Sequence, residues 1–102
     1  MTILEVLHNL GMPAAYMKFG KKMKPPYAVY YGAGQESFTA DGRPYTTRNI
    51  YTVEYYFIDK SLDKENDLEA AMIAAGFRYD KSEDVYIEDE KMNVIYYTVW
   101  RL

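Results

Sequence analysis

The first ten residues carry hydrophobic positions at the period of a helix. One side of such a helix is formed by Ile3, Val6, Leu7 and Leu10. Thr2 and Glu5 have the spacing of a capping box, in which each side chain satisfies a backbone N–H group at the helix start. Gly11 and Pro13 follow and are typical of a helix end. We therefore expect a helix over about residues 2–10.

The next segment has no regular pattern until a run of β-prone residues begins at Tyr27. Residues 12–24 contain a glycine and scattered lysines and methionines, which indicates a connecting loop. Pro25 and Pro26 suit the start or the edge of a strand, because a missing N–H donor costs least there. We expect a strand over about residues 27–31.

Strict alternation marks the clearest strand of the chain. Apolar and mixed positions alternate through Tyr51, Thr52, Val53, Glu54, Tyr55, Tyr56 and Phe57. This predicts a strand over about residues 45–58 with one strongly apolar face and one mixed face. The glycine-rich stretch 32–47 favours a wide hairpin or a projecting loop, in which Phe38 is a candidate for a short extra strand.

A second helical stripe lies in the C-terminal half. It consists of Leu68, Ala71, Met72 and Ala75. Asp63 is a candidate N-cap and Gly76 a candidate stop, so the pattern predicts a helix over about residues 64–75. Short β-rich runs follow. We expect strands over about residues 77–80, 85–88 and 92–101, with 88–91 as the turn of a terminal hairpin.

The order of these elements predicts an α+β fold, in which two helices pack on one face of a mostly antiparallel sheet of about four to five strands. A length of 102 residues with 49% hydrophobic content fits a single domain spanning residues 1–102. The expected core contains Val53, Phe57, Leu68, Met72 and Phe77.

Composition narrows the classes of function. The chain has no cysteine, so we expect neither a disulfide framework nor a thiolate zinc site. Its 12 Lys and Arg against 15 Asp and Glu disfavour nucleic acid as the main ligand, because duplex affinity rests mainly on neutralised phosphates. The sequence contains neither an 18-residue apolar run nor the pattern of a secretory signal. We therefore expect no membrane partner, and synthesis in a cytoplasm.

Residues suited to catalysis are sparse. The single histidine, His8, lies just off the apolar stripe of the first helix, where a surface role is usual. Gly32 to Gly34 lack the Gly-Lys-Ser/Thr ending of a phosphate loop. Acidic residues cluster at Asp80, Glu83, Asp84, Glu88, Asp89 and Glu90. Their spacing does not match an EF-hand loop, and solvated turns are the usual form of such runs, with a hard cation or an acid/base pair as the alternative. We assign no catalytic residue, no metal ligand and no cofactor, and we rank a small metal-dependent hydrolase last.

Contact surfaces are the better candidates. Lysines and apolar residues interleave at Met17, Lys18, Phe19, Lys21, Lys22, Met23 and Lys24. This segment suits an acidic partner or a solvated loop. Three tyrosine pairs, at 30–31, 55–56 and 96–97, each place one ring on either face of a strand. The outward rings either pack within the protein or meet a partner.

Several local motifs together resemble one family. They are Leu10-Gly11-Met12-Pro13 with Ala15-Tyr16, Lys24-Pro25-Pro26-Tyr27 leading to Val29-Tyr30-Tyr31, Ala40-Asp41-Gly42, Tyr45, Ile50 to Tyr56, Leu68-Glu69, Gly76-Phe77, Tyr79, Ser82-Glu83, Tyr86-Ile87-Glu88 and Ile95-Tyr96-Tyr97. This pattern, which spans nearly the whole chain, resembles small tail-completion or tail-terminator proteins of long-tailed phages and prophages of Gram-positive hosts.

The resemblance implies a structural, non-enzymatic protein of the virion tail or neck. Such proteins form a ring, commonly a hexamer, that caps the tail tube and faces the head connector. The partners would be copies of the chain itself, tail tube proteins and connector proteins. Candidate interface residues are Lys18, Lys21, Lys22, Lys24, Phe38, Asp41, Arg43, Tyr45, Glu88, Asp89 and Glu90. A head-to-tail contact would use opposite sides of each subunit, and the lysine segment and the acidic turn have opposite charge. The alternative is a prophage accessory module that acts on a host protein through its tyrosine-rich sheet face.

Overall fold

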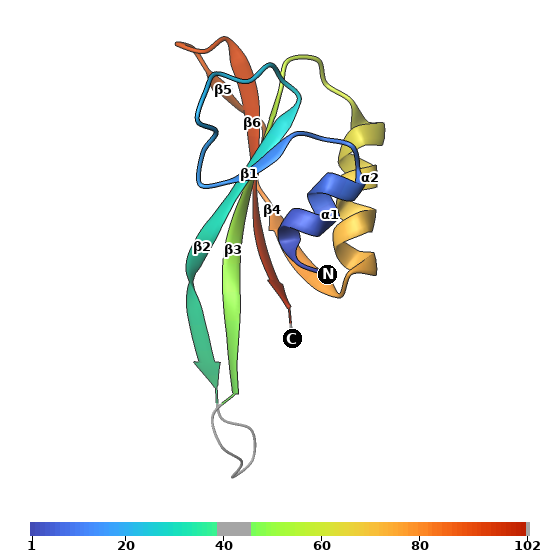
Figure 1. Cartoon of the computed structure of the whole chain (residues 1–102), viewed down its shortest axis with the longest axis vertical. Coiled ribbons are helices and arrows are strands. Elements are labelled where there is room, and N and C mark those ends of the chain that lie inside the picture. The colour runs from blue at the N-terminus through green and yellow to red at the C-terminus, as the bar shows by residue number, and fades with distance from the viewer. Residues whose placement is uncertain (39–45, 102) are drawn as a thin grey trace.

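The computed structural model describes residues 1–38 and 46–101, and within them two helices lie on one side of a six-stranded sheet (Figure 1). The elements are α1 (Ile3–Asn9), β1 (Ala14–Tyr16), β2 (Tyr27–Phe38), β3 (Thr46–Phe57), α2 (Leu62–Ala74), β4 (Phe77–Lys81), β5 (Val85–Ile87) and β6 (Met92–Arg101). The strand order is β1-β2-β3-β6-β4, with β5 also paired to β6. All pairs are antiparallel except β1 with β2. The expected α+β class is confirmed, although the sheet is larger than four to five strands.

The helix ends follow local sequence signals. Thr2 and Glu5 form the capping box, with the Glu5 N–H donating to Thr2 Oγ1 at 3.2 Å. For α2 the N-cap is Ser61 and not Asp63, since Ser61 Oγ accepts the Lys64 N–H at 3.3 Å. Asp63 instead lies in the first turn, where a carboxylate favours the positive end of the helix dipole.

The core lies between the two helices and the sheet. Val53, Phe57, Leu68, Met72 and Phe77 are all buried, as expected from the alternation and the helical stripe. Their neighbours in the same cluster are Ile3, Val6, Leu7, Ala28, Tyr55, Ile95, Tyr97 and Val99. The mixed face of the sheet therefore points away from the helices.

The segment expected to be a loop before Tyr27 contains a short strand. β1 pairs in parallel with β2, with Ala14 opposite Ala28 and Tyr16 opposite Tyr30. Three residues are too few to show a period of two, so the pairing depends on contacts with β2 that the local pattern does not reveal.

The glycine-rich stretch is strand for longer than expected. β2 does not end at Tyr31, because a β-bulge between Gly32 and Gly34 absorbs one residue and the pairing with β3 continues to Phe38. Gly34 has a φ of +111°, a backbone conformation that glycine adopts at little cost. Phe38 is thus the last residue of β2 and not a separate strand. The candidate residues Asp41, Arg43 and Tyr45 lie outside the described residues.

Candidate assembly surfaces

The distal parts of β2 and β3 form an arm that extends beyond the helices (Figure 1). Pairing of β3 with β6 stops at Ile50, opposite Trp100. Beyond this point, Gln35–Phe38 and Thr46–Asn49 pair with each other alone among the described residues. The molecule is correspondingly long, at 51 × 26 × 25 Å.

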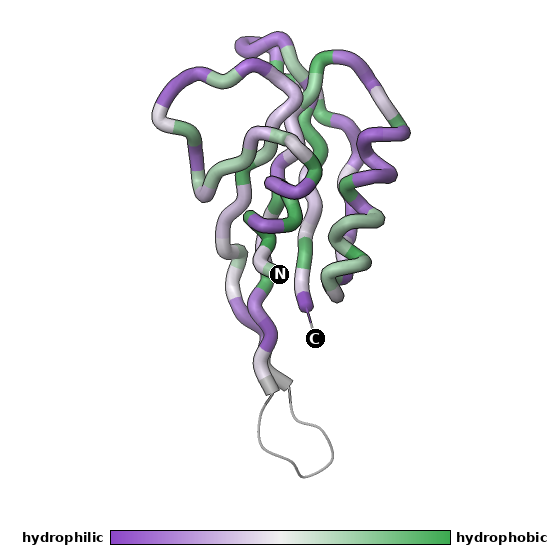
Figure 2. Tube along the Cα trace, turned by 45° about the vertical axis from the view of Figure 1, so that its right-hand side comes forward, coloured by the Kyte–Doolittle hydropathy of each residue, from purple (hydrophilic) through white to green (hydrophobic). Residues whose placement is uncertain are grey.

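Polar cross-strand pairs hold the arm together. Gln35 Nε2 donates to Asn49 Oδ1 at 2.9 Å, and Arg48 Nε donates to Glu36 Oε2 at 2.7 Å. The Arg48 guanidinium also lies over the Trp100 ring, 5.3 Å from its centre, which connects the arm to the body. Figure 2 shows that this part of the chain is mostly hydrophilic or neutral in hydropathy. The arm is therefore stabilised without a hydrophobic core of its own.

A hollow of about 760 Å³ lies where the arm leaves the body. It is lined by the start of α1, by Phe77 of β4 and Arg101 of β6, and by residues around the root of the arm, among them Tyr16, Tyr30, Arg48 and Tyr51. Tyr16 is 60% exposed and packs edge-to-face on Tyr30, with ring centres 5.4 Å apart. The arm root thus presents aromatic surface on the helix-covered side of the sheet.

The three tyrosine pairs divide between the two faces as expected. Tyr55 and Tyr97 are buried under the helices, and Tyr30 packs against the same core. Their partners point to the opposite face, which we call the open face: Tyr31, Tyr56 and Tyr96.

Glu54 is the polar centre of the open face. Its carboxylate accepts hydrogen bonds from the hydroxyls of Tyr31 at 2.5 Å and Tyr56 at 2.6 Å. The bond to Glu54 raises the pKa of Tyr31 to about 12. Burial, together with the bond to Glu54, also raises the pKa of Tyr56. Both phenols are thus held neutral beside a carboxylate, which fixes the orientation of their rings.

The lysine segment and the acidic turn lie beside each other in one subunit. Lys18, Lys21 and Lys22 line a hollow of about 530 Å³ together with Asp89 and Glu90. Phe19 packs edge-to-face on Tyr27 at 5.5 Å, so the segment covers one end of the open face. The two segments therefore do not lie on opposite sides of the subunit, as a head-to-tail contact between them would require.

The remaining sequence candidates are spread over the surface. Lys24 lines a different hollow beside Pro25 and Met12, while Glu88 is exposed at the start of the β5–β6 turn. His8 is exposed on α1. Within the described residues, no group of three or more His, Cys, Asp or Glu side chains is placed to hold a metal ion. The same residues contain no helix long and apolar enough to span a membrane.

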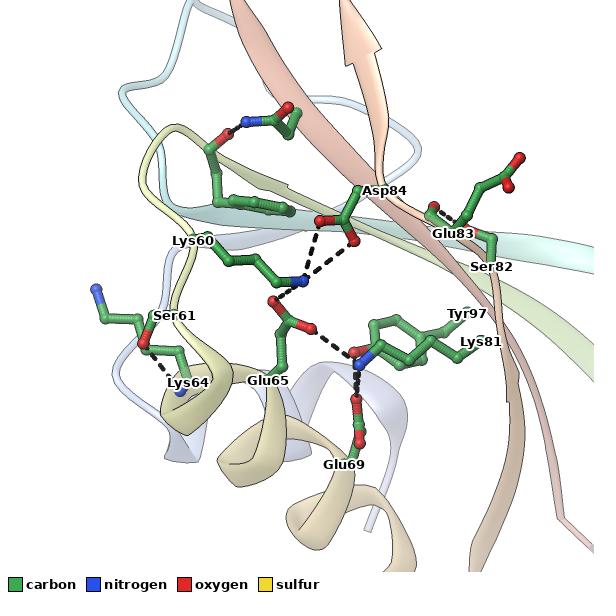
Figure 3. A network of polar contacts seen from close by, with 12 residues as sticks. Lys60, Ser61, Lys64, Glu65, Glu69, Lys81, Ser82, Glu83, Asp84 and Tyr97 are labelled. Atoms are coloured by element: carbon green, nitrogen blue, oxygen red, sulfur yellow. Dashed lines mark hydrogen bonds and ion pairs between the residues drawn. The ribbon is translucent and has the colours of Figure 1, made fainter.

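Sequence reasoning missed a buried charge network between α2 and the sheet (Figure 3). Glu65 is fully buried, with Lys60 Nζ 2.8 Å from its Oε2 and Lys81 Nζ 2.9 Å from its Oε1. The contact of Lys60 with Oε2 is an ion pair and not a well-directed hydrogen bond. Lys60 also pairs with Asp84 at 3.0 Å. The position of Glu65 three and seven residues before Leu68 and Met72, on the apolar stripe of α2, is the signal that could have revealed it.

Lys81 joins this network to a second carboxylate. Its Nζ lies 2.7 Å from Glu69 Oε2, and Tyr97 and Tyr79 donate to Glu69 at 2.7 and 3.1 Å. Burial alone would lower the pKa of Lys81, but its hydrogen bonds to Glu69 and Glu65 outweigh burial and raise it to about 12. Burial alone would likewise raise the pKa of Glu69, but the bonds from Lys81 and Tyr97 lower it. Each charge of the network has a fixed partner, so its chemistry is that of a structural clamp between α2, β4 and β6.

Comparisons with known proteins show the fold and nothing more specific. No family model matches the chain, and no curated protein matches it. Solved structures do match. One of them, whose name describes no function, is 13% identical, has a TM-score of 0.51, and is matched over 96% of this chain and 91% of its own. At this identity the likeness supports the fold alone.

Proposed function

We propose that this chain is a structural assembly protein of a long-tailed phage or prophage, which completes or terminates the tail where it meets the head. It acts in the virion tail or neck by binding copies of itself, in a ring that is commonly six-fold, and by contacting tail tube and connector proteins. It catalyses no reaction in this role. The family resemblance of its motifs supplies the role, and the β2–β3 arm is the structural observation that supports it.

The arm suits a subunit that must reach its neighbours. Closed rings arise from heterologous contacts, in which two different surfaces of each subunit meet. The arm belongs to the β2 half of the sheet and extends well past the helices, while β4 forms the opposite edge of the sheet. These two edges differ, so the chain can contact one neighbour through the arm and another through β4.

The test is a phage or prophage that carries the gene for this chain and from which the gene is deleted. We expect electron micrographs to show tails of abnormal length or tails that are not joined to heads. Expression of the wild-type chain from a plasmid should restore normal particles. Normal, head-joined tails in the deletion strain would contradict the proposal.

A second candidate function rests on the exposed tyrosine of the open face. Tyr96 is 38% exposed and lies across from Glu54, so aromatic surface on this face is available to a host protein. An accessory module that acts in this way should inhibit growth when the chain is expressed alone in the host, and Tyr96→Ala should relieve the inhibition. A purely structural protein should leave growth unchanged with either version.

A further inference from the structure

We propose that copies of this chain join by sheet-edge pairing, in which β4 of one copy adds to the free edge of the distal part of β2 in the next copy. The inference rests on the proposed ring assembly and specifies its contact. The partner is a second copy of the chain, and the bonds are main-chain hydrogen bonds between antiparallel strands.

Among the described residues, neither edge has a neighbouring strand. β4 pairs with β6 on one side, and no other described strand pairs with it. β1 covers β2 at Ala28–Tyr30 alone, so Gly34–Phe38 has β3 on one side and no described strand on the other. A strand with an unpaired row of N–H and C=O groups is a template for pairing with another chain. At the start of β4, the Phe77 carbonyl accepts a hydrogen bond from the neighbouring Arg78 side chain at 3.3 Å.

Strand direction determines how two copies would pair. Because β2, β3, β6 and β4 are successively antiparallel, β4 runs opposite to β2 in the same sheet. Rotation about an axis along the strands preserves their directions, so β4 would meet the next copy's β2 in antiparallel orientation. Antiparallel pairing is the slightly more stable arrangement. A cyclic ring and a continuous sheet are therefore compatible in this topology.

Charge selects one register for the pairing. Glu36 and Arg78 both lie on the open face, because Glu36 is opposite Arg48 and Arg78 is opposite Trp100. Placing Glu36 against Arg78 pairs opposite charges, whereas the register shifted by two residues would place Glu36 against Asp80. Opposite charges directly across strands are favourable and like charges are unfavourable. Arg78 and Asp80 are exposed and the Glu36 side chain is half exposed, so these groups are accessible to a neighbour.

The register implies a stagger between subunits. Within one sheet, Arg78 is opposite Trp100, Trp100 is opposite Ile50, and Ile50 is opposite Gly34. Arg78 and Gly34 therefore lie at the same height along the strands. Pairing Arg78 with Glu36 therefore shifts the neighbour by two residues, or about 7 Å along the strand. A closed sheet accommodates such a stagger by tilting its strands relative to the ring axis.

The helix-covered side supports the same contact. α2 contacts β4 on this side of the sheet, and Ile73 near its C-terminal end is 46% exposed. Pairing of β4 with the neighbour's arm would bring α2 toward the hollow at the root of that arm, which is lined by Tyr16 and Tyr51. An exposed apolar side chain and an aromatic hollow would then be covered together.

Cysteine cross-linking tests the proposal, because the native chain has no cysteine. We expect the double variant Glu36→Cys/Arg78→Cys to form a ladder of disulfide-linked multimers on non-reducing gels, both in purified particles and in concentrated protein. Either single variant should stay monomeric. Mixing the two single variants should give a mixed dimer alone. The matched control, Glu36→Cys/Asp80→Cys, should cross-link much less because it tests the shifted register.

Each alternative outcome has a distinct meaning. Cross-linking of Glu36→Cys to itself would show β2 paired with β2, and would overturn the heterologous contact. If the double variant stays monomeric on the gel although the particles that contain it have normal tails, edge pairing is overturned and the proposed function is left intact. Failure to cross-link in solution, combined with absence of the chain from particles, would overturn both. A ladder from solution with no tail defect in the deletion strain would support the edge contact and contradict the tail role.

Discussion

Glu65 is a fully buried carboxylate, so the groups beside it must balance its charge. Lys60 and Lys81 both lie beside its carboxylate and balance its charge. Their side chains are 44% and 31% exposed. With one lysine removed, the other still faces the carboxylate. With both removed, a fully buried carboxylate has no cation beside it. The energetic cost of the two changes should therefore be strongly non-additive.

We predict that Lys60→Met lowers the free energy of unfolding by about 1 kcal/mol. Lys81→Met should cost more, because it also removes the cation beside Glu69. The double variant should lose about 3–5 kcal/mol, the usual cost of an uncompensated buried charge. Urea unfolding of all four proteins measures this coupling. In a Glu65→Gln background, which lacks the buried carboxylate that the two lysines share, the two lysine changes should become additive. Additivity in the native background would contradict this account of the network.

Substitution of Phe57 tests how tightly the apolar face of the sheet is packed. Phe57 is 2% exposed and stacks on Tyr55 with ring centres 5.3 Å apart. Truncation to alanine leaves a cavity, so Phe57→Ala should destabilise the fold by about 3–5 kcal/mol. Phe57→Leu fills most of that space and should cost clearly less. A loss below about 1 kcal/mol for the alanine variant in chemical denaturation would mean that this site is not tightly packed.

Among the elements, the arm depends most on a single backbone feature. Gly34 has a φ of +111°, a conformation that other residues adopt only with strain, and it lies where the bulge lets β2 continue. We predict that Gly34→Ala lowers the free energy of unfolding by about 1–2 kcal/mol. Gly32→Ala is the matched control, since a Cβ there meets nothing within 4 Å and the φ is not positive. Equal effects in thermal unfolding would argue against a special role for the bulge.

Elements with a strong period could be predicted from the sequence, and elements defined by tertiary contacts could not. The alternation around Val53 and the stripe through Leu68 identified the core and the two faces correctly. The same alternation placed each tyrosine pair across the sheet. The distal half of β2 was missed because a glycine-rich composition favours a loop, while its strand conformation comes from pairing with β3.

The relative placement of the charged surface segments could not be predicted from the sequence. The segment containing Lys18 and the turn containing Glu90 are about seventy residues apart, and their proximity arises from the way one loop covers the open face. The residues of each segment show its charge, but they do not show that the two segments lie beside each other. Which strands lie at the edges of the sheet is equally hard to predict, because the position of β4 follows from the strand order and not from its own residues.

At the scale of the whole molecule, the groups that stabilise the fold differ from those of the proposed contact between copies. The clamp around Glu65 joins α2 to β4 and β6, while the proposed contact uses the outer edge of β4 and the arm. The charged residues of that edge, Arg78 and Asp80, bond to no part of the clamp. Changes at this edge should therefore weaken the proposed contact and leave folding intact.

Stability of the whole fold should fall in alkaline solution, because groups on both sides of the sheet hold their protons more tightly when folded. The pKa of Lys81 is raised from 10.5 to about 12 by its carboxylate partners, although burial opposes this. The pKa of Tyr31 is raised from 10.0 to about 12 by Glu54. A raised pKa in the folded state stabilises fully below the unfolded value, and this contribution disappears as the pH rises through the folded value.

The free energy of unfolding should therefore be level from neutral pH to about pH 10 and should decrease between about pH 10 and pH 12. Urea unfolding across this range, followed by circular dichroism, measures the decrease. In Glu54→Gln the phenol of Tyr31 no longer faces a carboxylate, so its share of the decrease should shrink while that of Lys81 stays. A flat profile through about pH 12 would contradict the raised pKa values of Lys81 and Tyr31. At about pH 11 the unfolded chain has largely lost both protons while the folded chain still largely holds them, so unfolding must become easier as the pH rises.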